Sequence, residues 1–317
     1  MKEQFDLNIP SVSSKTSTSE KVTIDIDNVD PPFQLPEVKT ELDEIYSAEE
    51  IKDPNNIVVN IEPGYPIVIL FGARTSGKTM VLIRLTRFLE SKGYKVEPYR
   101  LFRPSHDRNY RRMCDDFRNL CYDQYAASGT HTMNFMLLKI LDKTGRPICQ
   151  ILEAPGEHFF DVDKPNAQFP TYLLQIIQNI SNRRVWCFLV QKDWEEKDPS
   201  SRIKYSNKVR EIQRTDLDSA IFVCTQVDKY KNAIVNGVPN VQQFYIDIKN
   251  TYDNGSIFEN WRNTNPITKI FKPNLFQFVP FSSGAFSNTE SGRQVYIPGN
   301  DIYPALLWKS ILKSIRG

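Results

Sequence analysis

The residues with the clearest chemical signature lie between positions 72 and 79. The segment Gly72-Ala73-Arg74-Thr75-Ser76-Gly77-Lys78-Thr79 matches the pattern G-x-x-x-x-G-K-[ST] at every fixed position. Glycines let the backbone curl so that successive N–H groups point at phosphate oxygens. The lysine adds charge for the outer phosphates, and the last hydroxyl is placed to bind Mg²⁺. We therefore expect a nucleotide phosphate loop whose contacts come from Gly72, Arg74, Thr75, Ser76, Gly77, Lys78, Thr79 and Met80.

The elements on either side of this loop must hold it in place. An apolar run of strand length, Ile67–Phe71, leads directly into the loop. An amphipathic stretch from about 79 to 91 follows, and Gly93 ends it. A helix that starts at the end of the loop presents its positive N-terminal end to the bound anion.

From Tyr65 onward, short apolar runs alternate with amphipathic stretches, which is typical of an α/β fold with a mostly parallel sheet. Helices are expected over about 105–125, 170–181, 201–214, 241–252 and 303–315, and strands over 185–191, 220–224 and 275–279. One antiparallel hairpin is also expected. Its strands are Asn134–Leu141 and Ile148–Leu152, joined by a turn at 142–145.

The charge is unevenly distributed along the chain of 317 residues, whose 40 basic and 38 acidic residues leave a net charge of +2. Residues 1–62 hold 5 Lys, no Arg and 14 acidic residues, and the remainder holds 35 basic and 24 acidic residues. We interpret residues 1–62 as an acidic, Ser/Thr-rich leader that is disordered or loosely docked. Residues 63–317 form the body, with an Arg-rich insertion at about 95–130. The small total argues against a nucleic-acid binder.

Two further features bear on the cellular setting. No apolar run approaches the ~20 residues needed to span a bilayer, and the N-terminus lacks the apolar core of a secretion signal. The five cysteines form no C-x-x-C pattern, and the histidines show no paired spacing, so neither residue type suggests a metal site. We expect a cytoplasmic protein with no transmembrane segment and with reduced, mostly buried thiols.

The order of these motifs over residues 66–317 resembles the GTPase class of P-loop proteins, which includes Ras-like proteins and translation factors. A weaker resemblance links the chain to the double-GTPase families of bacterial signalling and conflict systems. The resemblance implies a three-layer α/β P-loop NTPase fold, in which a mostly parallel sheet carries one antiparallel hairpin strand. Members of this class have an antiparallel hairpin directly ahead of the second Mg²⁺ carboxylate, whereas P-loop ATPases and kinases do not usually have one there.

In this class the hairpin ends in the motif D-x-x-G, and Glu153-Ala154-Pro155-Gly156 resembles it with Glu in place of Asp. The resemblance implies that Glu153 holds Mg²⁺ through water and that the Gly156 N–H contacts the γ-phosphate. It also implies a switch threonine just before the hairpin that completes the Mg²⁺ shell. Thr132 is slightly favoured over Thr130 for that role.

Two later segments resemble the base-binding motifs of the class. In Thr225-Gln226-Val227-Asp228, the Asp228 carboxylate would accept hydrogen bonds from guanine N1–H and the exocyclic amine, a donor pair that adenine lacks. Thr225 stands where Asn is usual, and Gln226 replaces the Lys that stacks on the base. The backbone of Ser282-Ser283-Gly284 would contact guanine O6.

Hydrolysis needs a group that orients the attacking water, and the residues after Gly156 are the candidates. Glu157 could hold the water but faces a polyanion, whereas His158 could do so with less repulsion. Lys78 would stabilise the transferring phosphoryl group. Arg74 would either hinder closure of the loop around the γ-phosphate or add positive charge over the phosphates in cis. We expect slow intrinsic turnover.

Six arginines crowd the insertion ahead of the switch threonine: Arg100, Arg103, Arg108, Arg111, Arg112 and Arg118. They could bind an acidic protein partner, including the leader itself, or an anionic membrane or nucleic acid. A solvated helix face is the simpler alternative.

The sequence thus favours a switch protein that binds GTP or GDP with Mg²⁺ and changes its affinity for protein partners between the two states. One alternative is a non-hydrolysing interaction module that keeps the fold. Another is a P-loop ATPase or kinase, which the hairpin and Asp228 disfavour.

Overall fold

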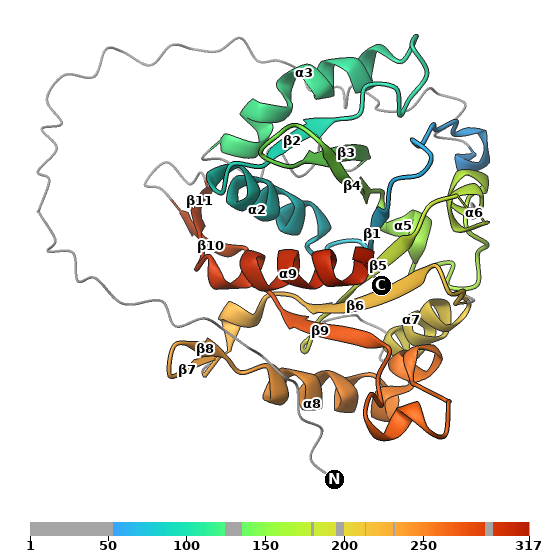
Figure 1. The fold of residues 1–317 in the computed structure, drawn as a ribbon, viewed down its shortest axis with the longest axis vertical. Helices are drawn as coiled ribbons and strands as arrows, with labels where there is room; N and C mark the ends of the chain where they lie inside the picture. Colours follow the sequence, from blue (N-terminus) through green and yellow to red (C-terminus); the bar gives the residue numbers. More distant parts are fainter. Residues whose placement is uncertain are drawn as a thin grey trace, which may run out of the picture. The chain divides into compact units, whose positions relative to one another are not determined.

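The computed structural model describes residues 53–123, 135–178, 181–194, 200–212, 214–230, 232–288 and 294–316. Its main sheet has seven strands in the order β2-β3-β4-β1-β5-β6-β9 (Figure 1). The strands are β1 (Ile67–Phe71), β2 (Lys95–Pro98), β3 (Met136–Leu141), β4 (Pro147–Glu153), β5 (Arg184–Val190), β6 (Asp218–Cys224) and β9 (Phe276–Pro280).

Five neighbouring strands of this sheet run parallel, and the β3–β4 hairpin supplies the antiparallel part. Strand β1 pairs with β4 on one side, Ile67 facing Gln150, and with β5 on the other, Ile67 facing Arg184. Strand β3 is antiparallel to both β4 and the short edge strand β2. Every residue of β1 and β5 is buried, as expected of central strands covered on both faces. The predicted mostly parallel α/β sheet with one hairpin is confirmed.

Helices lie on both faces of the sheet (Figure 1). They are α2 (Lys78–Ser91), α3 (Arg108–Tyr122), α5 (Gly156–Phe159), α6 (Thr171–Gln178), α7 (Ser201–Arg210), α8 (Val241–Thr251) and α9 (Ile302–Arg316), with 3₁₀ segments η1 (Pro54–Asn56), η2 (Val227–Lys229), η3 (Asp253–Trp261) and η4 (Thr268–Ile270). Helices α2 and α9 contact each other, whereas α7 and α8 both pack with η3. These are the three layers that the sequence predicts.

Aromatic side chains fill the layer between the sheet and the α7–η3 face. The Phe188 ring lies 5.1 Å from Phe222 and 5.7 Å from Trp261, measured between ring centroids. Phe71, at the end of β1, lies 5.9 Å from the Tyr205 ring of α7. Because these rings are fully buried, they fix the strand end from which the phosphate loop departs.

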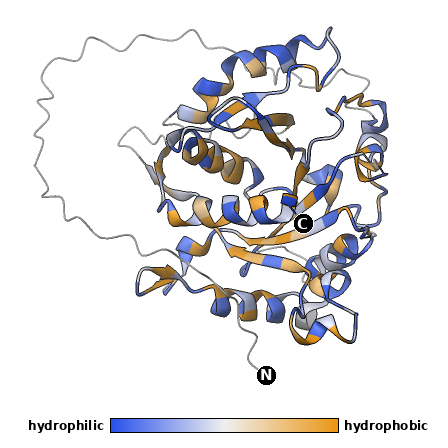
Figure 2. Cartoon of the chain, viewed as in Figure 1, coloured by the Kyte–Doolittle hydropathy of each residue, from blue (hydrophilic) through white to orange (hydrophobic). Residues whose placement is uncertain are grey.

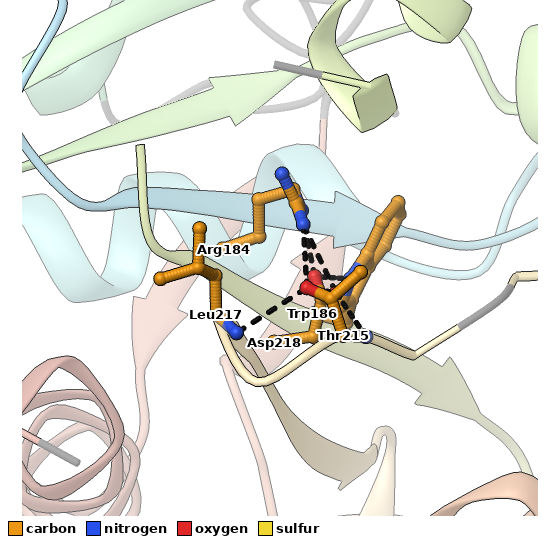
Figure 3. Close-up of polar contacts among 5 residues, drawn as sticks. All are labelled: Arg184, Trp186, Thr215, Leu217 and Asp218. Atoms are coloured by element: carbon orange, nitrogen blue, oxygen red, sulfur yellow. Dashed lines mark hydrogen bonds and ion pairs between the residues drawn. The ribbon is translucent and has the colours of Figure 1, made fainter. Parts of the chain in front are cut away.

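A buried ion pair lies at the opposite, amino-terminal edge of the sheet, where β5 and β6 begin (Figure 3). Arg184 donates from Nε to Asp218 Oδ1 at 2.7 Å and from Nη2 to Oδ2 at 3.0 Å. Trp186 Nε1 donates to the same carboxylate at 2.9 Å, and the Thr215 hydroxyl does so at 2.6 Å. The pair is therefore satisfied on both sides, which a buried charge requires.

Residues 53–62, the last part of the predicted leader, contact the body. The Val58 carbonyl accepts a hydrogen bond from Arg103 Nη1 at 2.7 Å. The Glu62 carbonyl accepts one from Gln150 Nε2 at 2.8 Å, and Ile57 is buried. Residues 1–52, the rest of the predicted leader, lie outside the described residues.

The five cysteines are buried and form no disulfide, which confirms the prediction of buried thiols. Burial raises the pKa of the Cys114 thiol to about 11, so it stays protonated at neutral pH. Within the part of the chain that the structure describes, no helix combines the length and apolarity that crossing a bilayer needs.

Candidate nucleotide-binding site

The predicted phosphate loop connects the carboxyl end of β1 to the first residue of α2. Because parallel strands all end at the same edge of the sheet, the residues that follow them meet there. Glu153 ends β4, Thr225 follows β6, and Ser282 follows β9. The fold thus places the predicted phosphate, metal and base segments at one edge.

The loop backbone curls tightly between Gly72 and Lys78. Thr75 has φ of 62° and Gly77 has φ of 92°, and the first value is unusual for a β-branched residue. Lys78 Nζ donates to the carbonyl oxygens of Gly72 and Ala73, each at 3.1 Å. Gly77 is the N-cap of α2. Because glycine has no side chain to accept a hydrogen bond from the first N–H groups of the helix, the positive helix end faces the loop uncapped.

Thr79 and Glu153, the two described residues predicted to hold Mg²⁺, are in direct contact. Thr79 Oγ1 donates to Glu153 Oε1 at 2.8 Å. The other carboxylate oxygen, Oε2, is buried and has no hydrogen-bond partner among the described residues. The Ser76 hydroxyl in the loop is likewise buried and unpaired there. Oxygen ligands of this kind suit Mg²⁺, so the residues present fit the ion.

Two ionisable groups, the Lys78 amine and the Glu153 carboxyl, are buried beside each other at this point. Burial lowers the pKa of Lys78, an effect that the nearby Glu153 and Glu157 carboxylates partly offset. Burial raises the pKa of Glu153 to about 8, against the opposing influence of Lys78 and of the Thr79 hydrogen bond. Buried ionisable groups whose pKa values are shifted by desolvation and by each other are typical of functional centres.

Gly156 packs directly onto the phosphate loop. A Cβ atom at this position would lie 2.3 Å from Arg74 N and 2.5 Å from Ala73 C. Only a glycine fits so close to another backbone, which gives a steric reason for the glycine of the Glu153–Gly156 motif. The segment after β4 and the phosphate loop are therefore in contact.

The candidate water-orienting residues lie on the short helix α5. Glu157 is exposed, whereas His158 is partly buried with Nδ1 2.8 Å from the Tyr172 hydroxyl of α6. Burial lowers the pKa of His158 to about 4, and Lys78 acts in the same direction while Glu157 opposes it. His158 is therefore neutral at neutral pH. Arg74 is exposed on the loop.

The base-recognition segments are tied to the phosphate loop and to each other. Thr225 Oγ1 donates to the Ser76 carbonyl oxygen at 3.1 Å, in the buried interior. Gln226 has φ of 60°, and Asp228 follows it as an exposed residue of η2. The Phe281 N–H donates to the Cys224 carbonyl at 2.7 Å, which joins the loops after β6 and β9.

A hairpin that was not predicted from the sequence follows Ser282 and Ser283. It consists of β10 (Gly284–Asn288) and β11 (Gln294–Pro298). The Ser283 carbonyl accepts hydrogen bonds from the Tyr296 hydroxyl at 2.6 Å and from the Gly299 N–H at 3.1 Å. Gly284 has φ of 131°, and a Cβ there would lie 2.1 Å from the Ile297 carbonyl oxygen.

Helix α2 also holds this hairpin through two arginines that sequence reasoning missed. Arg84 is buried and donates to the Gly299 carbonyl at 2.7 Å. The Arg87 guanidinium carbon lies 4.9 Å from the centre of the Tyr296 ring. The helix that begins at the phosphate loop therefore also supports the base loop. The signal in the sequence is a pair of arginines one turn apart in the middle of an amphipathic helix.

The remaining predicted residues lie either outside the described residues or in the Arg-rich segment. Thr130 and Thr132 lie outside the described residues. In the Arg-rich segment, Arg103 is buried and donates to Asp107 Oδ2 at 2.9 Å, so it serves the fold. Arg100 pairs with Asp115, and α3 exposes Arg108, Arg111 and Arg118 to solvent.

Comparison with known proteins finds no matching family model and no matching curated protein. Solved structures do show similarity. Toc33 from Arabidopsis thaliana, in complex with Mg²⁺ and GMPPNP, shares 12% identity over 84% of this chain and 88% of that chain, with a TM-score of 0.38. The S. cerevisiae Ski7 GTPase-like domain bound to GTP is 13% identical over 81% of this chain and 51% of that chain, with a TM-score of 0.41. A chain of the SRb-GTP/SRX complex from Chaetomium thermophilum is 10% identical over 73% of this chain and 99% of that chain, with a TM-score of 0.34.

The strand order and the phosphate loop of this chain carry the assignment of its fold. A phosphate loop follows the central strand β1, and the neighbouring hairpin β3–β4 ends at a buried carboxylate that contacts the loop threonine. The chain has a three-layer α/β fold with a phosphate loop after its central strand and one antiparallel hairpin in its main sheet.

Proposed function

We propose that this protein binds guanine nucleotides together with Mg²⁺ and acts as a GTP/GDP switch that hydrolyses GTP slowly. The observation that carries the proposal is the buried pair of Thr79 and Glu153 beside the phosphate loop, with one carboxylate oxygen unpaired. An unpaired buried carboxylate oxygen is costly. A cation at this point would compensate for it.

The phosphate end of the nucleotide would be held by the loop. Its backbone N–H groups and the uncapped N-terminus of α2 supply partial positive charge, and Lys78 supplies a full charge. The carbonyl oxygens that Lys78 now contacts are those of Gly72 and Ala73, and a bound polyphosphate would compete for the same ammonium group. When bound, Mg²⁺ would neutralise charge on the phosphate oxygens. Thr79 and Glu153 are the described residues that would hold it.

Base selection would rest on Asp228, supported by the loop Ser282–Gly284. An exposed carboxylate in η2, which follows β6, can accept two hydrogen bonds from guanine, and adenine offers no such pair. The bond from Thr225 to the Ser76 carbonyl would keep this segment in register with the phosphate loop. Gln226 would supply its alkyl stem to the face of the base.

Slow hydrolysis is supported by the placement of the candidate catalytic groups. His158 is neutral at neutral pH, so it could hold a water by hydrogen bonding, but its Nδ1 is engaged with the Tyr172 hydroxyl. Glu157 carries a negative charge, which disfavours approach to a γ-phosphate. Arg74 is solvent-exposed and would have to reorient to stabilise the transferring group.

The test is calorimetric titration of the full chain with GTP, GDP and ATP, with and without Mg²⁺, after identification of any co-purified nucleotide. We expect GTP and GDP to bind, ATP to bind much more weakly, and Mg²⁺ to strengthen GTP binding. Lys78→Ala should abolish binding, whereas Lys92→Ala at the far end of α2 is the matched control. Preference for ATP would support a P-loop ATPase or kinase instead.

Single-turnover measurement then separates a switch from a non-hydrolysing module. We expect slow formation of GDP by the isolated chain, and a large change in rate when a protein partner is present. Rapid turnover by the isolated chain would contradict the proposed rate. Binding without any turnover, with or without partner, would support the non-hydrolysing alternative.

A further inference from the structure

The most exposed apolar side chains of the described residues lie together in the loop between η3 and β9. Phe271 is 86% exposed, and Ile267 and Ile270 are each 72% exposed. All ten residues from 264 to 273 are solvent-exposed, so this loop projects from the body. Figure 1 shows it in orange beyond α7 and α8, and Figure 2 shows hydrophobic and hydrophilic residues side by side along it. A clustered apolar surface of this kind marks an interaction site.

The loop is built to present these side chains in a defined geometry. Asn263 donates from Nδ2 to the Lys272 carbonyl at 2.9 Å, and its N–H donates to the Pro273 carbonyl at 2.8 Å. Asn265 Oδ1 accepts from the N–H groups of Ile267 and Thr268 at 2.9 and 3.1 Å. Two asparagines thus close the base of the loop and start its 3₁₀ turn, so that the apolar residues stand at an ordered tip.

The charge around this apolar tip is positive. Between positions 260 and 275 the chain has Arg262, Lys269 and Lys272 and no acidic residue. The nearest acidic residue before it, Glu259, forms an ion pair with Arg210 at 2.7 Å. The lysines alternate with the apolar side chains along the turn, which places cations next to the hydrophobic groups.

Further positive charge comes from the end of α9 at the same edge of the sheet. The hydroxyl of Ser314 in α9 accepts from Gln277 Nε2 at 2.7 Å, and Gln277 is the second residue of β9. The exposed Lys313 and Arg316 of this last helical turn therefore lie at the edge where β9 begins. Among the acidic groups on neighbouring segments, Glu211 is paired with Lys208 and Asp218 with Arg184, and Asp216 is exposed.

The loop is on the side of the sheet opposite the nucleotide site. Strand β9 runs parallel to β6, β5 and β1, so the loop before β9 lies at the amino ends of the strands. The phosphate loop follows β1 and lies at the carboxyl ends. A surface bound at the loop would therefore leave the phosphate loop and Asp228 accessible.

We propose that residues 262–275 dock onto an anionic lipid bilayer, with Ile267, Ile270 and Phe271 inserted at the headgroup level and Lys269 and Lys272 paired with lipid phosphates or carboxylates. Apolar residues interleaved with basic ones match the chemistry of such a surface. A stable protein interface requires about 800 Å² on each partner, more than three side chains on a projecting turn provide. The bilayer therefore fits the small convex tip better than a protein does.

The test is co-sedimentation of the full chain with vesicles, either of phosphatidylcholine alone or of phosphatidylcholine mixed with phosphatidylserine. We expect binding to the mixed vesicles that weakens at high salt, and little binding to the neutral ones. The double variant I270S/F271S should lose at least tenfold in partitioning. K269Q/K272Q should lose the preference for phosphatidylserine, and Leu101→Ser, at a residue 62% exposed elsewhere, is the matched control.

Nucleotide binding should be unchanged in all these variants, because the loop is at the opposite edge from the phosphate loop. The two proposals are thus tested separately: vesicle binding can succeed or fail whatever nucleotide the chain binds. Equal partitioning of the wild-type chain and I270S/F271S would overturn the docking proposal. So would the absence of vesicle binding together with a stoichiometric protein partner that the same double variant loses.

Discussion

Replacing Gly156 by alanine tests the contact between the segment after β4 and the phosphate loop. The added Cβ would lie 2.3 Å from Arg74 N, 2.5 Å from Ala73 C and 2.6 Å from Arg74 Cα. Ordinary contact begins at 3.4 Å, and all three atoms belong to the backbone, so the two segments must separate by about 1 Å. Overpacking of this kind costs about 1–3 kcal/mol.

Under the proposed function, the strain should affect GTP more than GDP, because the Gly156 N–H would contact only the γ-phosphate. One to three kcal/mol corresponds to a loss of roughly 5- to 150-fold in GTP affinity, since about 1.4 kcal/mol is tenfold. Calorimetric titration with both nucleotides measures the difference, and thermal unfolding of the free chain measures the strain itself.

The control is Gly64→Ala, where a new Cβ meets nothing within 4 Å and only the positive φ of 82° is penalised. Unchanged thermal stability and unchanged GTP affinity in Gly156→Ala would refute the steric argument. A loss of stability with equal effects on GTP and GDP would keep the contact and refute the γ-phosphate assignment.

Three other predictions concern the metal, the base and the core. Glu153→Gln keeps the shape but removes the charge, so the strengthening of GTP binding by Mg²⁺ should fall at least tenfold in titrations with and without a chelator. Asp228→Asn should reduce GTP affinity and favour xanthosine triphosphate, because an amide can donate to the 2-oxo group of xanthine; a competition assay measures the exchange. Asp218→Ala removes the carboxylate that neutralises the buried Arg184 and should cost about 3–5 kcal/mol in chemical denaturation. Burial tends to raise the pKa of Asp218, but hydrogen bonds from Arg184, Thr215 and Trp186 outweigh it and hold the pKa below its usual range. The stability that this pair contributes is therefore present above the pKa of an unfolded Asp, ~3.9. It should be lost as pH falls through the lower folded value, and Asp218→Ala should flatten that acid limb of a pH–stability profile.

Local sequence determined the core of the site. The predicted strand Ile67–Phe71 has those bounds in the structure, and the predicted helix from 79 to 91 begins at Lys78. An apolar run, a glycine-containing turn and an amphipathic repeat are short-range signals, so they can be recognised without knowledge of the rest of the chain. The β3–β4 hairpin was predictable for the same reason, since its turn at 142–145 lies between two apolar runs.

Tertiary structure alone decided what surrounds that core. The hairpin β10–β11 holds the Ser283 carbonyl through Tyr296, but its strands carry little apolar pattern. Arg84 and Arg87 lie in a predicted helix, yet their partners are more than thirty residues away in sequence. Sequence spacing does not reveal which distant carbonyl an arginine will reach.

The exposure of the loop 262–275 is a further feature that the sequence alone does not predict. By its composition, a run containing Ile267, Ile270 and Phe271 is as suited to a core as to a surface. Its residues are exposed because η3 and β9 close the core before the loop projects beyond it. The sequence by itself determined the phosphate loop and the strand and helix that hold it, because that chemistry is encoded in adjacent residues. Which residues support the loop, and which apolar side chains face solvent, depended on how distant segments pack.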